Sequence, residues 1–191
     1  YSPFRLEAEG GASINIPNVT QLEYGELRVN NAATITTAQL TLVTNAILTA
    51  DAATPNFGRL TNIDNSSLYT YNGGILRLTN VYRVSITNEN QTWHAEDAGG
   101  LIDLSSLTNL WLGYYQALTV QAFAGGKVDL QRLANAPASV NVDARNTGSQ
   151  VNLNGLKGRW KSAAYSPIRL ETETGASISM PNVTQLEYAE L

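Results

Sequence analysis

Two aspartates, Asp103 and Asp129, are the residues whose type and spacing could support hydrolysis or cation binding. They occupy the same position in two similar segments, residues 99–107 and 125–133. Carboxylates about 5 to 9.5 Å apart can cleave a glycosidic bond, and carboxylate oxygens can also bind calcium. Neither segment brings a nearby histidine, a cluster of arginines or the further oxygen ligands that a calcium site needs. We therefore expect a solvated face, no enzyme activity and no cofactor, and keep cation contact by this pair as an alternative.

Aromatic residues follow the first of these segments. Trp111 lies between two leucines, so it should point to solvent if the leucines point into a core. Tyr114 and Tyr115 come directly after it. Exposed aromatic rings stack on sugars or fill a partner's pocket, so we expect these three residues to contact a glycan or a protein partner. The competing interpretation is that a long loop folds over the tryptophan ring.

Composition excludes several classes of protein. The chain has 12 Lys and Arg against 16 Asp and Glu, a pI near 5.0 and no basic stripe, which argues against nucleic-acid binding. No apolar run approaches the roughly 20 residues of a membrane-spanning helix. The absence of cysteine excludes a disulfide scaffold and thiol chemistry. His94 is the single histidine, and we expect it to be an ordinary surface residue.

A long repeat divides the chain. Residues 1–27 and 165–191 are identical at 21 of 27 positions, at an offset of 164 residues and without a gap. Duplication of a whole block explains this regularity. We expect residues 1–164 to form one complete block, residues 165–191 to begin the next, and the parent protein to be built from such blocks in tandem.

A shorter, degenerate repeat runs inside the block. An alternating apolar pair is followed by a glycine-containing turn, a second alternating pair, and Leu or Val three residues later. Alternation indicates strands with one buried face, and no window holds a helical pattern. A leucine-rich repeat is the nearest rival, but its Asn/Cys signature is missing. One apolar column, with a mean spacing near 23 residues, is expected at Ile16, Thr37, Leu60, Leu78, Leu104, Leu130, Leu153 and Met180.

These features predict an all-β parallel β-helix of about seven to eight coils, whose coils stack about 4.8 Å apart. Inward Leu, Ile and Val should form ladders from coil to coil, and one block should be about 33 Å long. Recurring asparagines at Asn18, Asn62, Asn80 and Asn182 are expected to stack at a turn and bond to one another.

The sequence Gly-Gly-Leu-Ile-Asp-Leu-Ser-Ser-Leu at 99–107, echoed at 125–133, resembles the right-handed β-helical repeats of very large bacterial secreted and surface proteins. Such arrays resemble filamentous adhesins, autotransporter passengers and matrix fibres alike. The resemblance covers almost the whole chain. It implies an extracellular or cell-surface filament or adhesin stalk, whose partners are further copies of itself, head-to-tail or covalently continued, and surface glycans. The alternative is a β-helix that binds or cleaves carbohydrate, which should have a groove with clustered carboxylates and basic residues.

Overall fold

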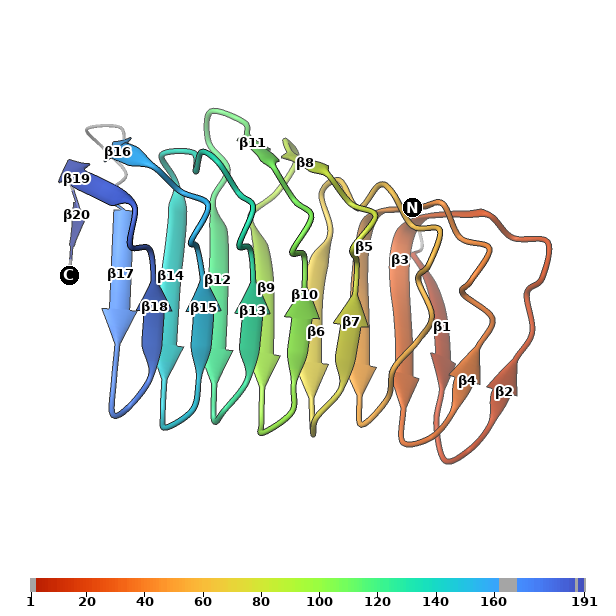
Figure 1. Cartoon of the computed structure of the whole chain (residues 1–191). Helices are drawn as coiled ribbons and strands as arrows, with labels where there is room; N and C mark the ends of the chain where they lie inside the picture. Colours follow the sequence, from red (N-terminus) through yellow and green to blue (C-terminus); the bar gives the residue numbers. More distant parts are fainter. Residues whose placement is uncertain (1–2, 162–167, 188, 191) are drawn as a thin grey trace.

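The chain folds into a parallel β-solenoid. The computed structural model describes residues 3–161, 168–187 and 189–190, which contain strands and no helix (Figure 1). The solenoid has about eight turns, spaced about 23 residues apart. The predicted all-β coil architecture and its mean period are therefore confirmed. Among the described residues, none belongs to a helix long and apolar enough to cross a membrane.

Two long sheets form the main walls of the solenoid, and all their strands pair in parallel (Figure 1). The nine-stranded sheet contains, in order, β1 (Phe4–Ala8), β3 (Gln21–Asn30), β5 (Leu42–Asp51), β6 (Ser67–Tyr71), β9 (Gln91–Glu96), β12 (Leu118–Phe123), β14 (Val140–Arg145), β17 (Ile168–Thr172) and β20 (Ala189–Glu190). The five-stranded sheet contains β7 (Ile75–Arg77), β10 (Leu101–Asp103), β13 (Lys127–Asp129), β15 (Gln150–Asn152) and β18 (Ser177–Ser179).

Short strand pairs complete the coils at other points along the chain. These pairs are β2 (Ser13–Ile14) with β4 (Thr34–Ile35), β8 (Arg83–Ile86) with β11 (Asn109–Leu112), and β16 (Gly158–Lys161) with β19 (Val183–Glu187). Each pair joins neighbouring coils, so a residue in one coil is matched to a residue about one period away.

The core is a set of apolar ladders between the walls. Alternation along each strand directs every second side chain inward, and parallel pairing places these side chains above one another. Along the nine-stranded sheet the buried ladder is Leu27, Leu48, Leu68, Trp93, Val120, Val142 and Leu170. Leu76, Ile102, Val128 and Val151 form its counterpart on the five-stranded sheet. Full burial of each such side chain contributes about 1.5 to 3 kcal/mol.

The apolar column at the corner after the five-stranded sheet differs from the prediction in one coil. The backbone carbonyl of each residue in this column accepts a hydrogen bond from the amide three residues later. For example, the Leu104 carbonyl accepts a hydrogen bond from the Leu107 amide. In the third coil this acceptor is Phe57, and Leu60 is its donor. The assignment of Leu60 to the column is therefore wrong. The Asn56 side chain, which accepts a hydrogen bond from the Gly58 amide, forms the turn that places Phe57 there.

The predicted asparagine stack is also wrong. Asn80 and Asn182 each donate a side-chain hydrogen bond to a backbone carbonyl of the preceding coil, at Gly58 and Asn154. Asn62 lies outside this column, because the column follows Phe57, and its side chain accepts from the Asp64 amide instead. Asn80 and Asn182 thus join coils through the backbone, and no two of the asparagines at this corner position, Asn18, Asn80 and Asn182, occupy neighbouring coils.

Variation in coil length is confined to one part of the turn. The path from the nine-stranded sheet through the five-stranded sheet to the corner is nearly constant, for example from Leu27 to Thr37 and from Val120 to Leu130. The return path varies more, and it is longest among fully described coils between Leu104 and Val120. Extra residues therefore gather in the loops that lead back into the nine-stranded sheet.

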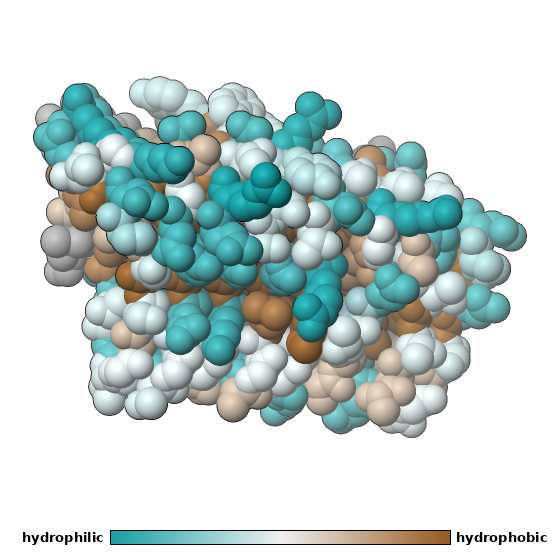
Figure 2. All heavy atoms as spheres, viewed as in Figure 1, coloured by the Kyte–Doolittle hydropathy of each residue, from teal (hydrophilic) through white to brown (hydrophobic). Residues whose placement is uncertain are grey.

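The outer surface is mainly polar in the view of Figure 2. Hydrophilic side chains cover much of this long face, and hydrophobic atoms show chiefly in a narrow band and toward the two ends of the solenoid. The polar residues that alternate with the core ladders account for this surface.

Candidate functional site

A groove lies at the corner where the loop between β11 and β12 returns to the nine-stranded sheet. Its volume is about 920 Å³. Successive coils supply its walls, because the loops at this corner stack beside one another. Its lining includes Asn90, Tyr114, Tyr115, Gln116, Asn141, Arg169 and Glu190.

Tyr114 and Tyr115 form an exposed aromatic pair in the wall of this groove. The two side chains are 89% and 85% exposed, and their rings meet edge to face with centroids 4.7 Å apart. The loop is anchored by the Gly113 amide, which donates to the Ile86 carbonyl at 2.7 Å. The structure thus places both predicted contact residues at a ligand-sized hollow, with their rings accessible.

Side-chain amides provide the polar part of the groove. Asn90 accepts a hydrogen bond from the Ala117 amide at 2.8 Å, and Gln116 donates to the Asn88 carbonyl at 3.4 Å. Among the described residues, each of these side-chain amides uses one of its two polar atoms in a hydrogen bond. Arg169 and Glu190 lie 3.9 Å apart and balance each other in charge. This lining suits a ligand with uncharged hydroxyl groups, which both donate and accept hydrogen bonds.

A smaller hollow of about 330 Å³ lies on the other side of Asn90. Tyr24 and Ile47, which are 51% and 41% exposed, contribute its apolar surface. Asn88 donates to the Asn45 side chain at 2.6 Å and fixes its amide wall. Because Asn90 lines both hollows, the two together follow the solenoid axis across several coils.

The structure does not bring Trp111 together with the two tyrosines. Trp111 lies on β11 opposite Ser85 of β8 and lines a separate hollow with Asp64 and Arg83. Its side chain is 59% exposed, so the interpretation that a loop folds over the ring is wrong. Trp111 remains a candidate contact, but at a different surface from the groove.

Asp103 and Asp129 are direct neighbours in the register of β10 and β13, as expected for equivalent positions. Their side chains shape turns: Asp103 accepts from the Ser105 amide at 3.1 Å, and Asp129 accepts from the Gln131 amide at 3.0 Å. Burial raises the pKa of Asp129, the Gln131 hydrogen bond opposes that rise, and the charge of Asp103 adds to it.

Further ligands for a cation are not gathered around this pair. Arg77 lies 3.9 Å from Asp103, and a side-chain amide hydrogen of Asn152 is donated to Asp129 at 3.1 Å. Within residues 3–161, 168–187 and 189–190, no group of three or more His, Asp or Glu side chains could hold a metal ion. Cation contact at Asp103 and Asp129 stays a prediction.

His94 is buried, which contradicts its expected place as a surface residue. It is 8% exposed although it projects from the outer side of β9. Tyr71 and Phe123 pack against it from neighbouring coils, with ring centroids 5.7 Å and 5.1 Å away. Its two ring nitrogens lie 3.0 Å from a Glu96 oxygen and 3.2 Å from the Gln121 side-chain oxygen.

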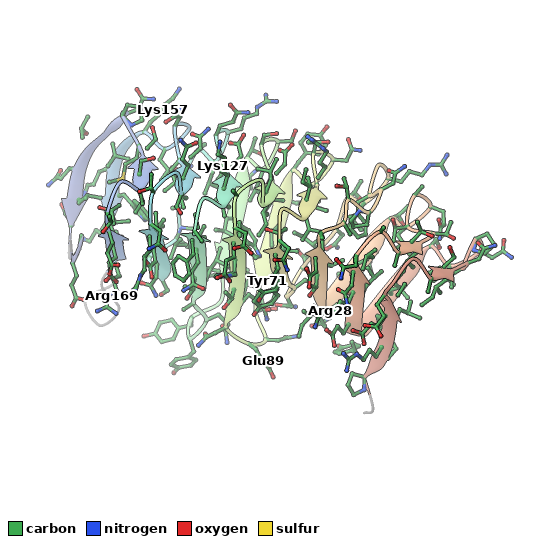
Figure 3. The ribbon with its side chains drawn as sticks, turned by 90° about the horizontal axis from the view of Figure 1, so that it is seen from below. Arg28, Tyr71, Glu89, Lys127, Lys157 and Arg169 are labelled. Carbon is green, nitrogen blue, oxygen red and sulfur yellow. The ribbon has the colours of Figure 1, made fainter. Side chains whose placement is uncertain are left out.

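The aromatic layer formed by Tyr71, His94 and Phe123 lies on the outer face of the nine-stranded sheet, outside the core ladder. In Figure 3, Tyr71 and Arg28 lie on the opposite side of the solenoid from Lys127 of β13. The register that matches Tyr69, His94 and Gln121 in successive coils creates the layer. The sequence signal for this layer is that bulky residues recur at outward positions one coil period apart.

Fold and groove together define a parallel β-solenoid with an aromatic and amide-lined hollow along one corner. No protein-family model, curated protein or solved structure matches the chain. The internal repeat and the groove are therefore the features from which function is inferred.

Proposed function

We propose that the chain is a structural segment of a long extracellular repeat protein, in which tandem 164-residue blocks form a stiff β-solenoid filament or adhesin stalk. The main support is that both copies of the 27-residue repeat fold with the same register. Arg5 faces Glu26 in the first copy, as Arg169 faces Glu190 in the second. The ion pairs are 3.5 Å and 3.9 Å long. A new block therefore begins with the same coil geometry as the previous one.

The nine-stranded sheet is continuous across the block boundary, which supports a single stiff rod rather than a chain of separately folded domains. β17 belongs to the second copy and pairs with β14 of the first block on one side and with β20 on the other. Hydrogen bonds and apolar ladders thus continue across the block boundary. In a solenoid each coil is stabilised by its neighbours, so a longer array adds length without a flexible joint. The extracellular location rests on the resemblance to secreted repeat arrays.

The test is a chain in which residues 1–164 occur twice before residues 165–191. Seven coil steps of about 4.8 Å predict that it is about 33 Å longer than the single-block chain. Small-angle scattering and electron microscopy should show one rigid particle. A control with a Gly/Ser linker between the blocks should bend. Two hinged particles from the direct fusion would contradict the proposal.

We also propose, as a second candidate function, that the groove beside Tyr114 and Tyr115 binds a neutral glycan. Binding is supported by the exposed rings of Tyr114 and Tyr115 and by the nearby side-chain amides. The charges of Arg169 and Glu190 cancel, which also favours a neutral ligand. Binding is favoured over cleavage because Glu190 is the single carboxylate among the described lining residues, whereas glycosidic hydrolysis normally uses two.

Titration with linear hexasaccharides of glucose, xylose and N-acetylglucosamine tests this function. We expect at least one to bind, and Tyr115→Ala to weaken it about tenfold through loss of ring stacking. Tyr82→Ala and Trp111→Ala are matched controls, because both rings are exposed but lie outside the groove. Absence of binding at millimolar sugar, or equal weakening by the controls, would exclude this function.

A further inference from the structure

The corner after the five-stranded sheet gives one side of the solenoid a single sign of charge. The five positions that follow the corner column contain no Asp or Glu in the described coils, although acids outnumber bases in the whole chain. Four exposed cations occupy these positions, Arg59, Arg83, Arg132 and Lys157, and together they form a basic strip. The corner residues from which the positions are counted are Ile16, Thr37, Phe57, Leu78, Leu104, Leu130, Leu153 and Met180.

No cation of the basic strip has an ion-pair partner among residues 3–161, 168–187 and 189–190. The arginines of the nine-stranded sheet differ, because Arg5, Arg28, Arg145 and Arg169 each pair with Glu or Asp at 2.8 to 3.9 Å. In Figure 3, Lys157 lies on the opposite side of the solenoid from Arg28 and Arg169. The strip therefore presents charges that the fold does not neutralise.

The basic strip runs along the solenoid axis. Its four residues belong to the third, fourth, sixth and seventh coils, so neighbouring charges are one or two coil steps of about 4.8 Å apart in the axial direction. The four cations are far apart in the chain, which is why the sequence alone shows no basic stripe. A row of cations at such intervals is complementary to a linear polymer that carries negative charges along its length.

Two hollows flank Arg83 and add hydroxyl, amide and aromatic groups to the strip. The hollow of about 400 Å³ is lined by Arg83, Tyr82, Thr41, Thr61 and Asn80. Threonine hydroxyls and asparagine amides can bond the hydroxyl groups of a sugar. The exposed ring of Tyr82, at 54%, can stack on a pyranose face.

The hollow of about 460 Å³ lies on the other side of Arg83 and is also lined by Asn109 and Trp111. Trp111 offers the larger ring and is 59% exposed. Asp64 is the single acid in the described lining of either hollow, and its carboxylate accepts a hydrogen bond from the Ser85 amide at 2.7 Å. An unpaired guanidinium thus lies between two sugar-sized hollows, each with one exposed aromatic ring.

We propose that the basic strip and its two hollows bind an acidic polysaccharide, with carboxylate groups on its sugar residues, stretched along the solenoid axis. Three of the four cations are arginines, whose planar guanidinium matches a carboxylate through two parallel hydrogen bonds. Nucleic acid fits less well, because the strip has at most one cation per coil and the whole chain has a net charge of -4. No residue of the strip lines the groove beside Tyr114 and Tyr115, so this site is independent of neutral-glycan binding.

Calorimetric titration with an oligogalacturonate tests the proposal, in buffer with EDTA so that no divalent cation bridges the carboxylates. A chain of about eight sugar residues is long enough to span the four coil steps of about 4.8 Å from Arg59 to Lys157. Its fully methyl-esterified form has the same backbone without the charge, and should not bind. Raising the salt from about 0.1 M to about 1 M should abolish most of the binding, because the Debye length falls from about 10 Å to about 3 Å.

Matched charge variants locate the site. Arg83→Gln should weaken binding about tenfold, and Arg83→Gln with Arg132→Gln about a hundredfold, because the two cations lie two coils apart and act independently. Lys127→Gln removes the same charge from an exposed, unpaired cation on β13, outside the strip, and should change the affinity less than twofold.

Trp111→Ala should weaken the acidic chain and leave any neutral hexasaccharide bound at Tyr115 unaffected, which separates this site from the groove. Circular dichroism should show that all variants fold alike, because the changed side chains are exposed. No binding of the oligogalacturonate, equal weakening by Lys127→Gln, or an unchanged affinity in the Arg83→Gln/Arg132→Gln chain would overturn the proposal. Equally tight binding of a single-stranded oligodeoxynucleotide with the same number of charges would overturn the assignment to an acidic polysaccharide.

Discussion

Gly25 and Phe4 face each other across β3 and β1, and the second copy of the repeat replaces both of them, with Ala189 and Ile168. A Cβ atom added at Gly25 would overlap the ring and the carbonyl oxygen of Phe4. At the equivalent pair in the second copy, Ile168 is smaller than Phe4 and its partner Ala189 is larger than Gly25. We therefore predict that Gly25→Ala is destabilising alone and is partly rescued by Phe4→Ile, which removes the overlap with the ring.

The magnitude follows from packing. Forcing a methyl group into a filled site costs about 1 to 3 kcal/mol, so we expect about 2 kcal/mol for Gly25→Ala. Phe4→Ile removes part of a half-buried ring and should cost about 1 kcal/mol. Because the double variant recreates the pair found in the second copy, its cost should fall about 1 to 2 kcal/mol below the sum of the two single costs.

Amide hydrogen exchange in β1 and β3 is the appropriate assay, because it reports the local opening of the two strands that carry the changes. A loss of 2 kcal/mol should speed exchange of these amides roughly 30-fold in Gly25→Ala, and the added Phe4→Ile change should restore up to about 1 kcal/mol, which leaves exchange roughly 5- to 30-fold faster than in the unchanged chain. Ile168→Phe and Ala189→Gly provide the mirror experiment, in which the first change should disturb β17 and the second should rescue it. Additive costs within about 0.5 kcal/mol in both copies would refute the reasoning.

Three further changes test the coil itself. Gly126→Ala should cost about 3 kcal/mol in urea unfolding, because the new Cβ would overlap the backbone carbonyl of Ala95, which cannot rotate away; a neutral effect would contradict the packing. Leu104→Ala should cost about 2 to 5 kcal/mol by opening a cavity in a fully buried ladder, measured in the same way. Burial raises the pKa of Asp129, so the charged carboxylate should lower stability as the pH rises from about 3.9 through this raised pKa. Asp129→Asn should remove that pH dependence and stabilise the protein at pH 7 by less than about 1 kcal/mol, and a less stable variant at pH 7 would contradict the pKa shift.

Periodicity was sufficient to predict the solenoid, because a column such as Leu78, Leu104 and Leu130 must stack once strands pair in parallel. It failed at the third coil, where Phe57 and Leu60 are both apolar and either satisfies the spacing. The turn formed by Asn56 decides between them. Asp103 and Asp129 form the same kind of turn, so an Asn or Asp directly before the corner residue was the local signal for the correct register.

The groove was less accessible to sequence reasoning than the fold. Alternation was enough to indicate that Trp111 points to solvent, and Tyr114 and Tyr115 were predicted as contacts because they follow it directly in the chain. The other walls come from Asn90, Asn141 and Arg169, which are far apart in the chain and meet only when the loops of successive coils are in register. His94 was misjudged for the same reason, because the rings that bury it belong to neighbouring coils.

Coil length varies mainly on the return path, so the strands that hold the coils together and the loops of variable length are separate parts of each turn. Residues can be inserted before a strand such as β12 without shifting the ladders that hold the coils together, because the path through both long sheets keeps its length. Loops at this corner can therefore diversify from coil to coil while the rod keeps its pitch. In an array of such blocks, each return loop would serve as an independent display position at a fixed height along the axis.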